Sequence, residues 1–377
     1  MKSTSRLARE NIKKLKPCVH GGEVWEVASK TGFRKEEILD FSSSVNPLGP
    51  SEKALEAIKS NLEHISSYPD SDSCLLREAI ASRFKGISKD NVIAGNGSTE
   101  LIYLFAETFM QKGDVALIPE PTFGEYERAV RKVGEEPKHL RLNPDFHVNL
   151  RVFARELSGA KIVFLCNPNN PTSVLTPPED LTAIAERALE EDAFVFLDED
   201  FLEFVEGEER FSLIGKIKRY PNLFVLRSFT KIFGLTGLRI GYGIASEEII
   251  SSLMNAKIPW NVNCLAQAAA IAALGDEEHL KKTRELIRDE KAFLMRELKR
   301  IKAFKTYPAD ANFIFIDIRQ SGYTAAQLKE KMLRHGVLIR DCSSFRGLDG
   351  YYIRIAVKTR RENELLLETF KKTLGGR

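Results

Sequence analysis

The chain has 377 residues, of which 56 are Lys or Arg and 53 are Asp or Glu, so its formal net charge is +3. Hydrophobic residues make up 43 % of it, which excludes a disordered or fibrous chain, and the length predicts two domains or one large one. The charges are dispersed, which argues against a nucleic-acid-binding surface and is compatible with small anionic ligands.

The N-terminal segment is basic between residues 2 and 16, and no apolar run follows it. We therefore predict a solvated helix there and no secretory signal. The longest purely apolar stretch, residues 268–274, is far shorter than the roughly 20 residues that a transmembrane helix requires. The five cysteines include no C-x-x-C pair, which argues against a disulfide framework or a metal site and predicts a reducing, cytoplasmic compartment.

Short apolar runs rich in Val, Ile and Phe alternate with amphipathic segments along most of the chain. They predict strands at residues 91–94, 115–118, 161–166, 193–198, 223–227 and 240–245, with helices in most gaps, for example 99–109 and 178–190. This alternation predicts a mainly parallel sheet that is covered on both faces.

The pattern changes after about residue 265. Charged helices are predicted at 276–301 and 324–335, strands at 312–317 and 351–357, and a last helix at 361–374. These elements predict a smaller α+β domain, to which residues 38–46 belong or form a bridge.

Ligands of open α/β sheets bind at the carboxyl ends of the strands, so the residues after each predicted strand are candidates. The segment GNGSTE (residues 95–100) offers backbone N–H groups and two hydroxyls at a helix N-terminus, which suits a phosphate. An ordinary glycine turn with a Ser or Thr cap is the alternative. The segment NPNNPT (residues 167–172) can present amides to a ring hydroxyl, or is a turn built on its Asn-Pro pairs.

Two charged residues follow later strands. Asp198 ends a predicted buried strand, where a cationic ring nitrogen or an arginine would offset the cost of an unpaired carboxylate. For three neighbouring acids we favour an ordinary salt bridge or solvation at the rim: Glu199, Asp200 and Glu203. Lys231 lies among three apolar residues, which would lower its pKa and favour the neutral amine that a Schiff base needs. A surface lysine with a buried stem is the alternative.

Three arginines lie close together near the C-terminus: Arg340, Arg346 and Arg354. Guanidinium groups bind carboxylate or phosphate through two parallel hydrogen bonds. Ion pairing with Asp341 or Asp349 is the alternative, and Arg346 in particular fits it.

Together these segments resemble the pyridoxal-5′-phosphate enzymes of the aspartate-aminotransferase fold, over nearly the whole chain, and it is their joint occurrence in this order that carries the resemblance. It implies an α/β domain with a mixed, mainly parallel seven-stranded sheet and a smaller α+β domain. We expect an N-terminal arm at residues 1–46 that contributes to the small domain and the substrate site. The large cofactor-binding domain would span 47–265 and the small domain 266–377.

The resemblance also implies roles for single residues. Lys231 matches the Schiff-base lysine, and Asp198 matches the carboxylate that keeps the cofactor's ring nitrogen protonated; these are the expected catalytic residues. Phe123 matches the aromatic residue that stacks on the pyridine ring, and Asn170 the residue bonded to the ring hydroxyl. Four residues match those that hold the cofactor phosphate: Ser98, Thr99, Ser228 and Arg239.

Tyr68 matches a tyrosine that reaches the phosphate of the neighbouring subunit's cofactor, which implies a homodimer with shared active sites. Arg354 matches the arginine that takes the substrate carboxylate. Two positions depart from the pattern: Phe201 stands where many aminotransferases have tyrosine, and Ser173 replaces a usual glycine. Phe201 points away from the commonest transaminases.

Two branches of the superfamily compete. The histidinol-phosphate aminotransferases share most of these motifs, and the L-threonine-O-3-phosphate decarboxylases share more. The chain resembles the second branch in the segments HGG (20–22), LDFS (39–42), NPLG (46–49), PWNVN (259–263), LIRDC (338–342) and GL (347–348). HGG followed by Trp25 is the most discriminating feature. Ser44 departs from the asparagine usual in that branch. The implied substrate contacts are His20, Gly21, Ser44, Asn46, Asn170, Arg340 and Arg354.

The expected function is the decarboxylation of a small phosphorylated amino acid, L-threonine O-3-phosphate, to (R)-1-aminopropan-2-ol O-2-phosphate for cobalamin biosynthesis. The alternative is a histidinol-phosphate aminotransferase that uses 2-oxoglutarate. A second alternative is a non-catalytic ligand-binding protein on the same fold, which the presence of Lys231 and Asp198 disfavours. We expect no nucleic-acid, membrane or metal partner.

Overall fold

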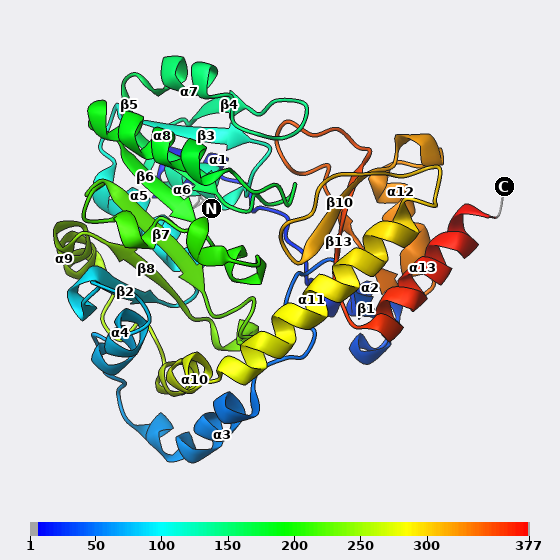
Figure 1. Ribbon diagram of the computed structural model, residues 1–377, viewed down its shortest axis with the longest axis horizontal. Coiled ribbons are helices and arrows are strands. Elements are labelled where there is room, and N and C mark those ends of the chain that lie inside the picture. The colour runs from blue at the N-terminus through cyan, green and yellow to red at the C-terminus, as the bar shows by residue number, and fades with distance from the viewer. Residues whose placement is uncertain (1–6, 376–377) are drawn as a thin grey trace.

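The computed structural model describes residues 7–375, and its larger part is built on a seven-stranded sheet (Figure 1). The strand order is β2 (Val92–Gly95), β8 (Gly241–Ala245), β7 (Leu223–Ser228), β6 (Phe194–Asp198), β5 (Ala160–Cys166), β3 (Val115–Glu120) and β4 (Lys138–Arg141). Only β8 runs antiparallel to its neighbours among these strands. The predicted mixed, mainly parallel sheet is therefore confirmed.

Both faces of this sheet are buried, because alternate residues of each strand enter two separate cores. Phe196 of β6 packs with α5 (Ser98–Phe109), α6 (Glu125–Val133) and α9 (Glu247–Ala256) on one face. On the other face, Val195 and Leu197 belong to the core that includes α4 (Cys74–Ala81), α7 (Leu150–Leu157), α8 (Pro178–Glu190) and α10 (Cys264–Leu274). Double burial explains why these strands read as continuous apolar runs.

The smaller part contains a four-stranded sheet in the order β12 (Arg340–Asp341), β13 (Tyr352–Ala356), β10 (Phe313–Asp317) and β9 (Lys305–Thr306). Three helices accompany it: α11 (Glu277–Leu298), α12 (Ala325–Leu333) and α13 (Arg360–Leu374). In Figure 1, α11 runs from the end of α10 toward this sheet. The predicted α+β character is confirmed, whereas the domain boundaries after residues 46 and 265 stay predictions.

The segment before the large sheet is tied to the small part. Strand β1 (Leu39–Asp40) pairs in parallel with β11 (Val337–Leu338), and the N–H of Phe41 bonds to the carbonyl of Leu338 at 2.7 Å. The small part therefore includes at least the start of the predicted 38–46 segment. The remaining helices before the large sheet are α1 (Glu10–Lys14), α2 (Val24–Thr31) and α3 (Glu52–Ser60).

Short 3-10 helices complete the chain: Lys35–Glu37, Leu62–Ser66, Lys89–Asn91, Leu202–Phe204, Glu208–Arg210, Ile214–Lys216, Thr236–Leu238 and Arg319–Ser321. The expected N-terminal helix corresponds in part to α1, and the part of that prediction on residues 2–6 lies outside the described residues. Within residues 7–375, no helix is both long enough and apolar enough to cross a membrane.

Candidate active site

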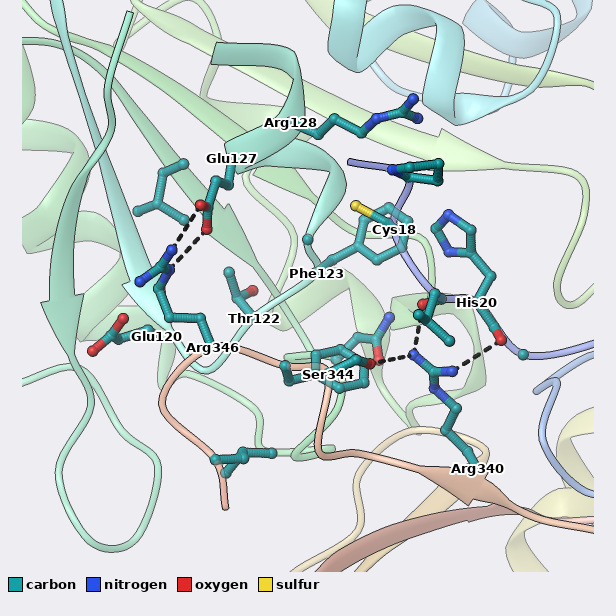
Figure 2. A pocket seen from close by; sticks show the side chains of 18 of the residues that line it. Cys18, His20, Glu120, Thr122, Phe123, Glu127, Arg128, Arg340, Ser344 and Arg346 are labelled. Atoms are coloured by element: carbon teal, nitrogen blue, oxygen red, sulfur yellow. Dashed lines mark hydrogen bonds and ion pairs between the residues drawn. The ribbon is translucent and has the colours of Figure 1, made fainter. Parts of the chain in front are cut away.

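A cavity of about 1070 Å³ lies at the carboxyl ends of the parallel strands, between the large sheet, the N-terminal arm and the segment after β12 (Figure 2). Many of the residues singled out from the sequence line it, although they are spread over more than 330 positions of the chain. They are His20, Gly21, Ser44, Thr99, Phe123, Asn170, Lys231, Arg239, Arg340 and Arg354. These residues therefore surround one cavity, and their individual roles stay predictions.

One wall of the cavity is a cradle at the N-terminus of α5, where backbone N–H groups have no partner within the helix. Gly97 precedes the helix with a φ of +82°, and a Cβ atom there would lie 2.5 Å from Arg239 Nη2. A Cβ atom on Gly241 would lie 2.6 Å from the backbone N of Ser98. The two glycines thus allow Arg239 and the N-terminus of α5 to approach each other, with Thr99 in the cavity wall, and this donor set suits a phosphate.

Ser98 and Ser228 are both buried and do not line the cavity. The hydroxyl of Ser98 donates to Asp200 Oδ2 at 3.1 Å, while Ser228 Oγ lies 2.6 Å from Thr230 Oγ1. The predicted contact of each serine with a phosphate stays a prediction.

Asp198 lies at the end of β6 and is buried. Its Oδ2 accepts a hydrogen bond from the hydroxyl of Tyr126 at 2.5 Å, and its Oδ1 accepts one from the backbone N of Asp200 at 2.9 Å. Burial raises the pKa of Asp198 to about 8, with a further rise from Asp200, while the Tyr126 hydrogen bond opposes it. A cationic ring nitrogen beside Asp198 would restore the ionised form.

Two of the three neighbouring acids form the salt bridges that we expected. Glu199 pairs with Arg227 at 2.9 Å, and Glu203 lies 3.8 Å from the same guanidinium. The expectation is wrong for Asp200, which is buried and has no ion-pair partner among the residues that the structure describes.

Lys231 follows β7 and lines the cavity. Its Nζ atom lies 5.2 Å from the centroid of the Phe201 ring. Burial lowers the pKa of Lys231, and the guanidinium of Arg354 adds to this, whereas the carboxylates of Asp200 and Asp198 oppose it. A lowered pKa favours the neutral amine that a Schiff base needs, and this role of Lys231 stays a prediction.

Two buried arginines in the cavity wall have no acidic partner within the described part of the chain. Arg354, 6 % exposed, donates to Asn170 Oδ1 and to the carbonyl of Ser42. Arg340, 3 % exposed, donates to the carbonyls of Val19 and His20 and to Ser344 Oγ (Figure 2).

The Nε atoms of both arginines are buried without a partner. Burial lowers the pKa of Arg354 to about 10 and lowers the pKa of Arg340 as well. Two uncompensated buried cations in one cavity favour a ligand with two anionic groups. Arg346 differs, because it is paired with Glu127 by two hydrogen bonds of 2.9 Å.

The N-terminal arm is packed against the cavity. His20 Nε2 lies 2.8 Å from Glu125 Oε1, and its ring centroid is 5.9 Å from that of Phe123. A Cβ atom on Gly21 would lie 2.1 Å from the carbonyl oxygen of Ser42, so the arm can follow this path only with glycine there. His20 and Gly21 of the HGG segment thus line the cavity, and their contact with a substrate stays a prediction.

Two predicted residues do not line this cavity. Asn46 does not line the cavity, because its side chain donates to the carbonyl of Ile232 at 2.8 Å and to Thr283 Oγ1 at 2.9 Å. Asn46 therefore anchors the loop that contains Lys231. The prediction that its side chain contacts the substrate is wrong, because the amide bonds inside the protein. Tyr68 is 81 % exposed and lies against Trp260, with 4.7 Å between the ring centroids. Its role at a neighbouring subunit stays a prediction.

Three residues of this site were missed by the sequence analysis. Tyr126 and Glu125 lie in α6 and hold Asp198 and His20, but acids and aromatics in a helix carry no signal of such contacts. Asp200 is the third, because the sequence analysis named it but assigned it to a salt bridge or to solvent. Only its position two residues after Asp198 pointed to it.

The chain belongs to the class I and II aminotransferase family, whose family model matches residues 36–370. Over 97 % of its length it is 35 % identical to the histidinol-phosphate aminotransferase of Methanosphaera stadtmanae, of which it covers 98 %. Several further archaeal relatives have the same name.

A relative from Caldanaerobacter subterraneus, with the provisional name threonine-phosphate decarboxylase, is 38 % identical over 95 % of this chain and 94 % of its own. Among solved structures, the histidinol-phosphate aminotransferase of Clostridium acetobutylicum superimposes with a TM-score of 0.83 at 29 % identity, over 89 % of this chain and 99 % of that one.

The family depends on pyridoxal 5′-phosphate, and the residues of this site fit that cofactor. The glycine-lined cradle suits its phosphate, the buried Asp198 suits its ring nitrogen, and Lys231 offers an amine for its aldehyde. Among residues 7–375 there is no group of three or more His, Cys, Asp or Glu side chains that could hold a metal ion.

Proposed function

We propose that this chain is an aminotransferase for a small phosphorylated amine of the histidinol-phosphate class, with a 2-oxo acid as the second substrate. The observation that carries the proposal is the pair of buried arginines, Arg340 and Arg354, that share the cavity with Lys231 and have no acidic partner among the described residues. Each guanidinium can accept one anionic group: a phosphate from the amine, or a carboxylate from a dicarboxylic 2-oxo acid.

Different residues of the cavity would bind the cofactor, move the proton and orient the substrate. Asp198 would face the cofactor's ring nitrogen, the α5 cradle its phosphate, and Phe123 one face of its ring. Bound pyridoxal 5′-phosphate supplies an electron sink for the bonds at the amine-bearing carbon of the substrate. Lys231 Nζ takes the proton from that carbon and returns it at a different carbon. Arg340 and Arg354 would hold the substrate so that its C–H bond, and not another bond, is presented to Lys231 Nζ.

The decarboxylation of L-threonine O-3-phosphate is the second candidate, and it is favoured by features of the arm. Gly21 packs against Ser42 and sets the arm beside the cavity, and Phe201 faces Lys231 in place of the usual tyrosine. In this reaction the two arginines would hold a phosphate and a carboxylate of one substrate, so that the bond to the carboxylate is the one that breaks. The relative from Caldanaerobacter supports this reading.

A paired assay on the purified, cofactor-loaded protein separates the two candidates. One reaction contains histidinol phosphate and 2-oxoglutarate, and glutamate is measured. The other contains L-threonine O-3-phosphate, and CO2 and aminopropanol phosphate are measured. Glutamate in the first alone supports the aminotransferase. CO2 in the second alone contradicts it in favour of the decarboxylase, and no product in either contradicts both.

We also propose that the protein is a homodimer in which Tyr68 completes the partner's site. Several large apolar side chains are exposed in the segments 62–75 and 258–260: Leu62, Ile65, Tyr68, Leu75, Ile258 and Trp260. The two segments are tied together, because Lys257 Nζ donates to the carbonyl of Ser71 at 2.7 Å. An exposed apolar cluster of this kind is typical of an interface between subunits.

A further inference from the structure

The wall of the cavity carries a large excess of positive charge. Among the described residues, nine Lys or Arg side chains line it, against two carboxylates, Glu120 and Glu127. Four of these cations belong to the candidate site, and two are exposed lysines of the arm. Arg131 and Arg346 are both paired with Glu127, each at 2.9 Å. The remaining cation is Arg128 of α6, to which no role has been assigned.

The guanidinium of Arg128 has few partners of its own. It makes no hydrogen bond within residues 7–375, and its Nε atom is buried without a partner. The side chain lines the cavity and is 33 % exposed. Its ion-pair partner among the described residues is Glu125, with 3.7 Å between Arg128 Nη1 and Glu125 Oε2. This distance is too long for a hydrogen bond.

Glu125 is already engaged by other groups. Its Oε1 atom lies 2.8 Å from His20 Nε2, and its Oε2 atom accepts a hydrogen bond from the hydroxyl of Tyr103. Burial opposes the ionisation of Glu125, but these bonds outweigh it and lower the pKa of Glu125 to about 2. The carboxylate therefore compensates the charge of Arg128 only in part. The terminal N–H donors of Arg128 stay available to a ligand.

The same carboxylate places Arg128 close to the arm. His20 and Arg128 both contact Glu125, and Arg340 donates to the main-chain carbonyl of His20 at 2.9 Å. In Figure 2, His20 accordingly lies between Arg128 and Arg340. The two guanidinium groups thus border the same part of the cavity, on either side of His20.

We propose that Arg128 is a specificity-determining residue that receives the phosphate group of the substrate. This inference rests on the phosphorylated substrate of the proposed function, and it holds for both candidate reactions. A phosphate group carries about two negative charges and three terminal oxygens, so it gains from donors on more than one side. A carboxylate has a single charge and two oxygens, which one guanidinium satisfies. Arg128 therefore favours phosphate over carboxylate ligands.

The test measures how inorganic phosphate and succinate, a dicarboxylate, bind to the holoprotein. Calorimetry at about 0.15 M salt suits it, because charges more than about 8 Å away are then largely screened. Arg128→Gln should weaken phosphate binding about tenfold and leave succinate binding unchanged. Arg131→Gln is the matched control, since Arg131 lies in the same helix and cavity wall but is paired with Glu127 and Glu136. It should leave both affinities unchanged.

Unchanged phosphate affinity in Arg128→Gln overturns the proposal. An equal loss of phosphate and succinate binding also overturns it, because that result would show a general effect of charge. The same holds for an equal loss of phosphate binding in Arg131→Gln, and for a wild-type holoprotein that binds no phosphate.

Arg128→Lys keeps the test decisive if Arg128→Gln fails to fold. This variant retains the charge but loses the two parallel hydrogen bonds of a guanidinium, so phosphate affinity should fall at least about threefold. An unchanged affinity would overturn the proposal. Because neither probe is converted to a product, failure of the paired assay and failure of this binding test are distinguishable.

Discussion

The hydroxyl of Tyr126 donates to the buried carboxylate of Asp198, with 2.5 Å between the two oxygens. This bond stabilises the ionised form of Asp198 against burial, which raises its pKa to about 8. Tyr126 comes from α6 and Asp198 from the end of β6, so the bond also ties the helix that carries Glu125 to the sheet.

Tyr126→Phe should raise the pKa of Asp198, because one hydrogen bond to its charged form is lost. Bonds to charged groups contribute about 1.5 kcal/mol or more, so kcat/KM should fall about tenfold and its acidic limb should move to higher pH. The ring remains stacked on Phe164, at 5.3 Å, so the fold should persist. Tyr220→Phe, which removes a bond to Glu186, is the control. Equal pH profiles for both variants would contradict the role of Tyr126.

Arg354→Lys should weaken substrate binding strongly. A lysine cannot keep the contacts to Asn170 and the carbonyl of Ser42 while it also binds an anion through two parallel bonds. We expect KM for the anionic substrate to rise at least about tenfold. The exposed Arg187, in α8, provides the control variant Arg187→Lys, which should leave KM unchanged. Steady-state kinetics with either candidate substrate checks this, and an unchanged KM in Arg354→Lys would refute it.

Lys231→Ala and Tyr68→Ala should each be close to inactive alone, yet partly active when mixed. If Tyr68 serves the neighbouring site, a heterodimer of the two variants has one site with both wild-type residues. Random reassociation should then restore about a quarter of the wild-type activity. Activity of the mixture after unfolding and refolding together measures this. No recovery, with dimers present by light scattering, would exclude a shared site.

Gly21→Ala should displace the arm, since its Cβ atom would lie 2.1 Å from the carbonyl oxygen of Ser42. The clash concerns a backbone atom, so we expect the arm to move and the activity to fall about tenfold or more, while the melting temperature changes little. Gly215→Ala is the control, because no atom lies within 4 Å of its added Cβ. Retained activity in Gly21→Ala would show that the arm position is not needed.

Glu203 should make the stability of the protein depend on pH. Burial raises its pKa from 4.5 to about 7, so the folded state binds its proton more tightly than the unfolded state does. The free energy of unfolding should therefore fall as pH rises from about 4.5 to 7 and then level off, by about 3 kcal/mol for this group. Glu203→Gln should remove that fall. Urea unfolding at several pH values measures it, and parallel curves for both proteins would contradict the assignment.

The central strands of the large sheet could be predicted from the sequence, for a physical reason. A parallel strand buried on both faces is a continuous apolar run, so β5, β6 and β7 were visible, and their ends located Asp198 and Lys231. Edge strand β4, with the sequence KHLR, has no such run and was missed. The two-residue strands were missed because they are too short to show the alternation of apolar and polar residues that marks a strand.

Side-chain direction was beyond the reach of the sequence. Asn46 was one of the predicted substrate contacts, but its amide bonds to Ile232 and Thr283 instead. The sequence pattern does not show in which direction this side chain points. Tyr126 is 72 positions from Asp198, and no local pattern joins them. Asp200 was expected to pair with an arginine or with water, because burial of an unpaired acid is costly. The residues next to Asp200 in the sequence do not indicate that it is buried.

Arg340 holds the arm by the main-chain oxygens of Val19 and His20, not by their side chains. Every amino acid provides a carbonyl oxygen, so this attachment survives any replacement at positions 19 and 20 that leaves the path of the backbone unchanged. The arm can thus present new side chains to the cavity, which Val19 and His20 both line, without being released from the rest of the protein. Substitutions at positions 19 and 20 can therefore change the lining of the cavity while the arm stays attached, whereas Gly21 is held fixed by the space available to it.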